Sequence, residues 1–276
     1  MSTKISPLSK IYVFLIFLFL YAPMVVTMVF SFNGTESTYV FSGFSFQWYK
    51  ELFHDRATMN ALKNTLILAF VSSLISTILG LLASVGINSM RKKYLKSSVM
   101  TVTNIPMMNP EIVTGISMML LFVFAGTLLN IKDVLGFWTL LIAHVSFQLP
   151  YIILSVMPKL RQMDMKIYEA AQDLGCPPFK AFIKVVLPAI LPGLVSGAIM
   201  AFTLSIDDFI ISYFTNGPDF QTLPIHIFSM TKKRIKPDMY ALSTIIFVVT
   251  FVLLLLMNYV SAKSDKKQNG TEEDEE

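Results

Sequence analysis

The most informative stretch of the chain is EAAQDLGCPPFKAFIKVVLP, which spans residues 169–188 and separates two long apolar segments. Asp164, just upstream, belongs to a residue type that caps helix N-termini, so we expect a short helix to run from it to Leu174. Gly175 and the two prolines that soon follow form a helix stop, because glycine permits a left-handed exit and proline cannot continue the helix. The stretch therefore predicts a short helix, a sharp exit and a second helical run into the next apolar segment.

The small side chains of this short helix favour a docking element. The residues concerned are Glu169, Ala170, Ala171 and Gly175, with Leu187 and Pro188 at the far end of the stretch. Alanine and glycine have little bulk, so the helix can lie close in a groove of another protein. The glutamate would supply one polar contact. The alternative is an amphipathic hairpin that only caps a bundle of helices.

Six apolar segments make up most of the chain, each long enough to supply the roughly 20 helical residues that cross a bilayer. They lie at 11–32, 61–88, 99–129, 136–157, 189–214 and 240–262. Only 14% of the residues are charged, against about 25% in a typical soluble domain. The first segment is too long for a signal peptide, so we expect it to be retained. The predicted fold is an all-α, polytopic membrane protein with six transmembrane helices in one domain, residues 1–264.

Lysine and arginine in short loops set the orientation of such a protein. Most of the 22 basic residues fall on one side if the N- and C-termini are both cytoplasmic, which places the loop 158–188 in the cytoplasm as well. A basic cluster at Lys232–Lys236 is an exception to this rule. Residues 265–276 form a short acidic tail, which we expect to be cytoplasmic.

The fifth apolar segment carries small residues at a strict spacing of four. They are Gly193, Gly197, Ala201 and Ser205. Such a stripe lets two helices approach closely in lipid. It predicts helix packing, either within this chain or at the joint with a second membrane subunit.

Three acidic residues lie inside the expected membrane segments, where a charge is costly and usually functional. Glu111 lies 12 residues into the third segment, which places it near the middle of the bilayer, and Pro106 and Pro110 should loosen the helix there. Asp207 and Asp208 lie toward the outer end of the fifth segment, about 100° apart around the helix. One of them can then face a pathway while the other is paired inside the bundle.

The acids have no lysine or arginine within these segments to neutralise them, so a transported cation could supply the missing charge. Trp48, in the first outer loop, could add a cation–π contact to an amine. An anchor at the membrane interface is an equal alternative for this tryptophan. The candidate pathway residues are thus Glu111, Asp207, Asp208 and Trp48.

Nothing in the sequence points to an enzyme. Cys176 is the only cysteine, and the three histidines are too far apart in the sequence to form a helical pair, so polar packing is their expected role. No glycine is followed by lysine, which excludes the end of a phosphate-binding P-loop. We expect no catalytic residues, no metal site and no cofactor bound by this chain.

The stretch 169–188 closely resembles the EAA motif of ABC-importer permeases, which reads EAA, three residues, Gly, nine residues and Ile-x-Leu-Pro. The one departure is Val185 in place of isoleucine. Three further segments resemble PotC-type spermidine/putrescine permeases: FSFNGTE with FQWYKELF, MMNPEIVTGISMMLLF around Glu111, and LSIDDFIISYFTNGPDFQTLPIHIFSM at 204–230. The resemblance covers the chain from the first apolar segment to the sixth.

The resemblance implies a type I ABC importer permease fold in the bacterial plasma membrane, with a cytoplasmic coupling helix at 167–175. It also implies a PotB-like sister permease, a PotA-like ATPase dimer that uses ATP and Mg, and a PotD-like extracytoplasmic binding protein. This chain would form half of a polyamine pathway that works by alternating access.

Two other functions remain open. One is an ABC permease for a different substrate, such as ferric iron; the acids disfavour an anion. The other is a proton-coupled secondary carrier for a cation, in which Glu111 and Asp207 exchange protons. A carrier has no use for the docking stretch at 169–188, so that stretch separates the two classes.

Overall fold

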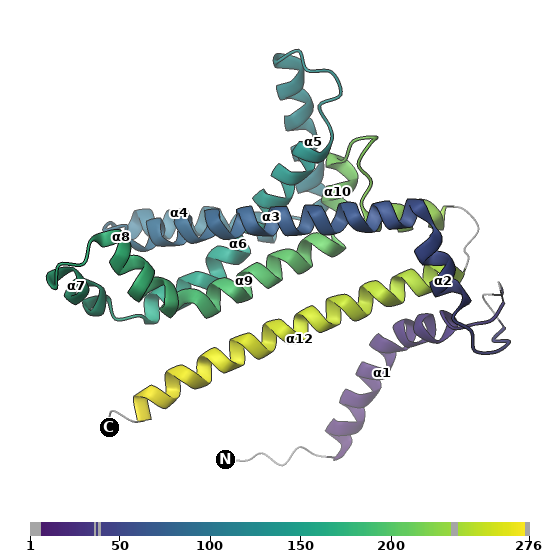
Figure 1. Ribbon diagram of the computed structural model, residues 1–276, viewed down its shortest axis with the longest axis horizontal. Coiled ribbons are helices and arrows are strands. Elements are labelled where there is room, and N and C mark those ends of the chain that lie inside the picture. The colour runs from purple at the N-terminus through teal and green to yellow at the C-terminus, as the bar shows by residue number, and fades with distance from the viewer. Residues whose placement is uncertain (1–6, 36, 38–39, 233–236, 274–276) are drawn as a thin grey trace. The chain divides into compact units, whose positions relative to one another are not determined.

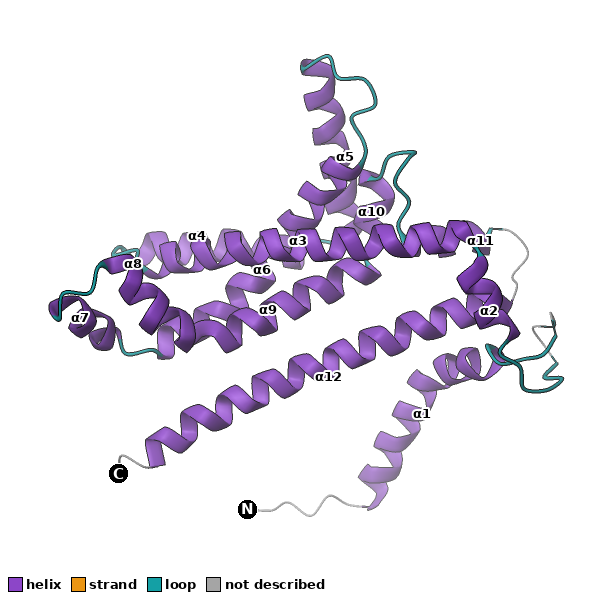
Figure 2. Cartoon of the chain, in the orientation of Figure 1, coloured by secondary structure: helices purple, strands orange, loops and turns teal. Residues whose placement is uncertain are grey.

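The computed structural model describes residues 7–35, 37, 40–232 and 237–273, with side chains up to Tyr259. Every regular element in these ranges is a helix, and the one bridge between extended residues pairs Asn33 with Phe44 (Figure 2). The basic cluster beyond Lys232, and the end of the acidic tail, lie outside the described residues. The predicted all-α class is confirmed.

The helices follow one another along the chain as Figure 1 shows. Their bounds are α1 Pro7–Phe30, α2 Gln47–His54, α3 Arg56–Asn88, α4 Lys93–Met108, α5 Glu111–Leu128, α6 Phe137–Gln162, α7 Met165–Asp173, α8 Pro178–Ala181, a π-helical turn Phe182–Val186, α9 Leu187–Asp207, α10 Ile210–Thr215, α11 Leu223–Thr231 and α12 Pro237–Glu273.

Six helical stretches among the described residues are long and apolar enough to cross a membrane, as predicted. They are Leu8–Phe30, Arg56–Asn88, Glu111–Leu128, Phe137–Gln162, Pro178–Asp207 and Pro237–Tyr259. The number of spans is therefore confirmed, while two of the expected segments are interrupted.

The expected third segment, 99–129, is two helices and not one. α4 ends at Met108, and the extended residues Asn109 and Pro110 separate it from α5. The cause is local, because proline pushes the preceding residue out of the helical region and has no N–H to donate. The loosening predicted from the prolines is confirmed, but the expectation of one span with Glu111 12 residues into it is wrong. Glu111 is the first residue of α5.

The expected fifth segment, 189–214, is also divided. α9 ends at Asp207, Asp208 is extended with φ −65° and ψ 119°, and α10 begins at Ile210. No proline or glycine lies at this break. Asp208 belongs to a residue type that caps helix N-termini, and the side-chain contacts that stabilise the break are described below.

The chain forms two compact units. The first comprises residues 1–60 with 227–249, and the second residues 61–226 with 250–276. In the first unit, Asn33 organises the loop between α1 and α2: its side-chain amide donates to the carbonyls of Ser37 and Val40, and its side-chain oxygen accepts from Ser42. Trp48 of α2 packs onto this loop.

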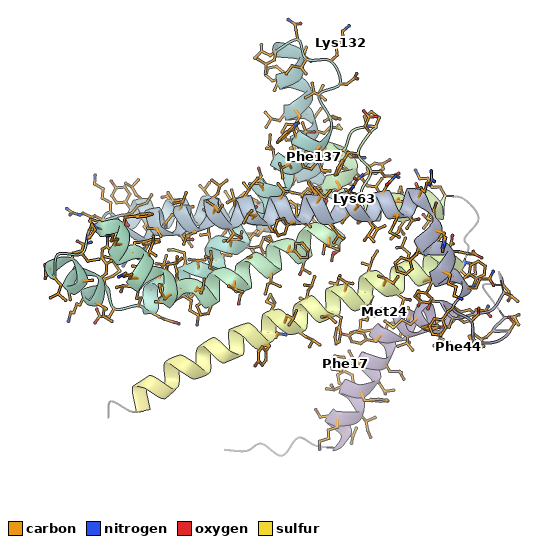
Figure 3. All side chains as sticks on the ribbon, in the orientation of Figure 1. Phe17, Met24, Phe44, Lys63, Lys132 and Phe137 are labelled. Atoms are coloured by element: carbon orange, nitrogen blue, oxygen red, sulfur yellow. The ribbon has the colours of Figure 1, made fainter. Side chains whose placement is uncertain are left out.

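In the second unit, α6 packs along α9, and α5 rises away from the layer that contains α3, α6 and α9 (Figure 1). The apolar core between these helices includes Ile152, Val156 and Ile190, which are fully or almost fully buried. Figure 3 shows Lys132 in the loop at the far end of α5 and Phe137 at the start of α6, where its ring contacts Phe220 with centroids 5.0 Å apart.

The small-residue stripe of α9 faces α6 of the same chain. A Cβ atom on Gly193 would lie 2.7 Å from the carbonyl oxygen of Ser155, and one on Gly197 would lie 3.2 Å from the Ser155 Cβ. Ala201 is fully buried in the same core. The sequence left two partners possible for this stripe, a helix of the same chain or a second membrane subunit. In the structure the stripe packs against a helix of the same chain.

Candidate functional site

A cavity of about 390 Å³ in the second unit brings the three intramembrane acids together. Glu111 reaches it from the start of α5, and Asp207 and Asp208 reach it from the break between α9 and α10. The rest of the wall is apolar and aromatic, with Phe147 and Tyr151 from α6. The cavity thus combines carboxylates with aromatic surface.

The two helix breaks meet at this cavity because α5 packs directly on α10. The contact is close at Gly115, where an added Cβ would lie 3.0 Å from the Phe214 ring and 3.4 Å from the Ile210 carbonyl oxygen. Glu111 lies one helical turn before Gly115 on α5. The sequence placed Glu111 and the aspartates in separate segments 96 residues apart, and this packing unites them.

The neighbouring aspartates have different surroundings. Asp207 is exposed to the cavity, whereas the side chain of Asp208 is only 6% exposed. Asp208 Oδ2 accepts a hydrogen bond from the Ser212 backbone N–H at 2.7 Å and lies 3.5 Å from His144 Nε2. Asp208 therefore caps the first turn of α10 and pairs with α6.

The expectation that one of the two aspartates is paired inside the bundle is confirmed for Asp208, although its partner is neither a lysine nor an arginine. Its partner is His144, a fully buried residue of α6 whose role was expected to be ordinary polar packing. For Glu111 and Asp207, the described part of the chain provides neither a hydrogen bond nor an ion pair from another side chain. Two free carboxylates thus face the cavity.

Behind Asp208, hydrogen-bonding side chains continue into the bundle. His144 Nδ1 lies 2.7 Å from Ser205 Oγ, and Ser205 Oγ lies 3.3 Å from Ser72 Oγ of α3. Gln148 of α6 then donates to Ser72 Oγ at 3.0 Å and accepts from Ser76 at 2.8 Å. We call this chain of contacts, from Asp208 through His144 to Ser76, the buried polar network.

Sequence reasoning missed most of this network. Ser205 was assigned to helix packing alone and His144 to ordinary polar packing, and Gln148, Ser72 and Ser76 were not singled out. A usable signal was present, because His144 and Gln148 are four residues apart and so share one helical face, as do Ser72 and Ser76. Polar residues with this spacing in apolar segments favour contacts between helices.

Trp48 does not line the carboxylate cavity. Its side chain is 5% exposed and its indole N–H donates to the Asn33 carbonyl oxygen at 2.6 Å, inside the first unit. The ring is covered in this structure and so does not present its face to an amine. The environment of Trp48 favours a structural role.

The predicted short helix of the docking stretch is present as α7, and its cap is confirmed, since the Asp164 side chain accepts from the Lys166 backbone N–H. Gly175 follows in the left-handed region with φ +83°, as the helix stop predicts. Leu174, beside it, is 89% exposed, and Ile167 is also exposed. An apolar surface on a short, sharply turned helix is suited to bind another protein, and docking stays a prediction.

No group of three or more histidine, cysteine, aspartate or glutamate side chains suited to a metal ion occurs in the part of the chain that is described.

Fold and site together define a polytopic helical membrane transport protein, with paired helix breaks around an acidic cavity and a protruding helical loop. The chain belongs to the family of binding-protein-dependent transport system inner membrane components, whose family model matches residues 76–267. It is thus a multi-pass inner-membrane permease subunit and is not itself catalytic.

Two relatives match almost the whole chain. The putrescine transport system permease protein PotI of Escherichia coli K12 is 34% identical over 263 residues, which is 95% of this chain and 94% of PotI. The spermidine/putrescine transport system permease protein PotC of Haemophilus influenzae is 34% identical over 258 residues, 94% of this chain and 98% of that protein.

Solved structures share the fold. A chain of a bacterial ABC transporter that imports the acidic polysaccharide alginate aligns with a TM-score of 0.69 and 17% identity, over 91% of this chain and 92% of that chain. A chain of the inward-facing MetNI methionine ABC transporter aligns with a TM-score of 0.58 and 18% identity, over 76% and 99%. The predicted ABC importer permease fold is confirmed.

Proposed function

We propose that this chain forms half of the membrane pathway of an ATP-driven importer for polyamines such as spermidine and putrescine. The names of its relatives PotI and PotC support this cargo. The observation that carries the proposal is the cavity in which Glu111 and Asp207 have no partner among the described residues.

The chemistry of a polyamine fits this cavity. A polyamine carries ammonium groups separated by methylene spacers, so it needs carboxylates for the charges and apolar or aromatic surface for the spacers. Glu111 and Asp207 supply the first, and Phe147, Tyr151 and Phe209 supply the second. Aromatic faces also attract ammonium groups directly. An anionic cargo would meet like charges here and is disfavoured.

The energy for transport would come from other subunits. We propose that α7 is the coupling helix and docks in a groove of a PotA-like ATPase, with Glu169, Ala170, Ala171 and Gly175 at the contact and Leu187 and Pro188 at the return into the membrane. Two such ATPases would bind ATP and Mg. Both termini and α7 would then lie in the cytoplasm of a bacterial cell.

Transport would proceed by alternating access. ATP binding closes the ATPase dimer and moves α7, the pathway shared with a PotB-like sister permease opens outward, and a PotD-like binding protein releases the polyamine into it. The carboxylates hold the cation while the pathway closes outside. ATP hydrolysis then returns the pathway to the inward-open state.

The domain bounds 1–264 and the tail 265–276 stay predictions.

The variant Glu111→Gln tests the cavity. It removes one negative charge and keeps the shape, so the polyamine loses one charge-assisted contact, worth about 1.5–3 kcal/mol. We expect the KM for spermidine uptake to rise about 10- to 100-fold, while the complex still assembles. The measurement is radiolabelled spermidine uptake in membrane vesicles, together with co-purification of the subunits.

The matched control is Asp133→Asn, which removes the same charge in the loop between α5 and α6, at a residue that does not line this cavity. It should leave the KM unchanged. If Glu111→Gln transports spermidine with an unaltered KM, the cavity is not the cation site. Transport of ferric iron in place of spermidine by the unaltered complex would replace the proposed cargo.

A further inference from the structure

His144 contacts both sides of the helix break that shapes the cavity. Its Nε2 atom lies 3.5 Å from Asp208 Oδ2, at the break, and 3.0 Å from Ser212 Oγ, within α10. Its Nδ1 atom lies 2.7 Å from Ser205 Oγ, near the end of α9. One fully buried imidazole thus ties the two helix ends to α6.

The contacts at α10 reinforce this tie. Asp208 accepts from the backbone N–H groups of Ile211 and Ser212 at 3.3 and 2.7 Å. At the other end of α10, the Thr215 carbonyl oxygen accepts from Thr139 Oγ1 of α6 at 3.1 Å. Side chains of α6 therefore contact both ends of this six-residue helix. In turn, α5 packs on the surface of α10.

Hydrogen bonds from the hydroxyl groups of the buried polar network hold the His144 imidazole in one orientation. If Ser205 donates to Nδ1, then the Nε2–H of a neutral imidazole points toward Asp208 and Ser212. Ser205 can accept in turn from Ser72, whose own oxygen accepts from Gln148. Every polar atom along this path then has a partner, as buried polar groups require.

We propose that His144 is a positioning residue for the carboxylate cavity. By holding Asp208 against the bundle, it fixes the break between α9 and α10, so that Asp207 is turned toward the cavity beside Glu111. Asp208 then serves the geometry of the site, and Glu111 and Asp207 are the two carboxylates that meet the cargo. This inference rests on the proposed function only for the identity of that cargo.

Uptake kinetics separate the two roles. A contact with the cargo changes the KM, whereas a lost positioning contact lowers the fraction of correctly shaped sites and so the maximum rate. We expect Asp207→Asn to raise the spermidine KM about tenfold or more. His144→Leu and Asp208→Asn should each lower the maximum rate about tenfold and change the KM less than about threefold.

A double variant and a conservative variant sharpen the test. Because His144 and Asp208 act as one unit, the double variant His144→Leu with Asp208→Asn should be no slower than the slower single variant. His144→Gln keeps an N–H donor that can reach Asp208 and should recover most of the rate lost in His144→Leu. Multiplying losses in the double variant, or a KM effect at Asp208→Asn equal to that at Asp207→Asn, would overturn the proposal.

A second measurement needs no cargo. In the assembled complex with Cys176→Ser, we expect Asp207→Cys to react about tenfold faster than Asp208→Cys with the cationic reagent 2-aminoethyl methanethiosulfonate, because only the first position is open. Equal rates would overturn the inference, even if spermidine is transported. A faster reaction at Asp207→Cys would support the inference even if the unaltered complex transports no polyamine. That pair of results would refute only the proposed cargo. Should Asp208→Cys fail to assemble, the kinetics of Asp208→Asn decide.

Discussion

Asp207 and Asp208 are adjacent in sequence and have opposite surroundings, because the chain leaves the helix between them. Asp207 is the last helical residue of α9, and Asp208 is extended and caps the next helix. A buried carboxylate is tolerated when it is hydrogen-bonded and paired, and His144 and the backbone of α10 provide both. The free carboxylate is then the one beside it, Asp207, which lines the cavity.

A second prediction at the scale of single residues concerns Trp48, for which we expect an effect on stability and not on cargo binding. Trp48→Phe keeps an aromatic ring but leaves the buried carbonyl of Asn33 without its donor, which costs about 1–3 kcal/mol. We therefore expect a lower thermal midpoint of the purified complex and a spermidine KM within about twofold of the original. An unchanged midpoint with a KM raised at least about tenfold would instead assign Trp48 to cation binding.

At the scale of elements, the six membrane helices could be predicted from hydropathy because a span must satisfy its backbone internally and present apolar side chains to lipid. The break before Glu111 was predictable as well, since Pro110 disfavours a helical conformation at Asn109. The cap at Asp164 and the left-handed exit at Gly175 follow from local residue types in the same way.

The break at Asp208 was predictable only in part, because one of its stabilising contacts comes from far away in the sequence. Aspartate is a common helix cap, and Asp208 accepts from the nearby Ile211 and Ser212 N–H groups, but its partner His144 lies 64 residues earlier. The same is true of the cavity itself, which exists only because α5 packs on α10 at Gly115. Periodicity indicates which face of a helix is polar, but it does not indicate which other helix that face meets.

The small-residue stripe of α9 yields a prediction at this scale. In Gly193→Ala the new Cβ would meet the Ser155 carbonyl oxygen at 2.7 Å; since this is backbone, α6 must shift, at a cost of about 1–3 kcal/mol. We expect a thermal midpoint several degrees lower, at about 2–4 °C per kcal/mol, measured by size-exclusion chromatography of the heated complex.

Gly86→Ala in α3 is the matched control, because a Cβ at Gly86 has nothing within 4 Å. The midpoint should stay constant or rise slightly, since alanine favours the helix over glycine. Equal losses in the two variants would show that the α9 stripe has no special contact with α6.

For the whole molecule, the distribution of charge matters more than its sum. The net charge of +4 combines a basic chain with an acidic tail, and within the membrane helices around the cavity the free charges are carboxylates. A cargo with its own positive charges completes such a site. Under the proposed function, the exposed Leu174 at the end of α7 would help link that site to a source of energy outside the membrane.

Uptake by the purified complex in liposomes tests this account most directly. The chain is purified with its sister permease and ATPase, reconstituted, and supplied with the binding protein and radiolabelled spermidine outside. We predict uptake that requires ATP on the ATPase side and that does not respond to a proton gradient alone. Glu169→Lys on α7 should abolish uptake and release the ATPase during purification. Uptake driven by a proton gradient without ATP, undiminished in Glu169→Lys, would contradict the account.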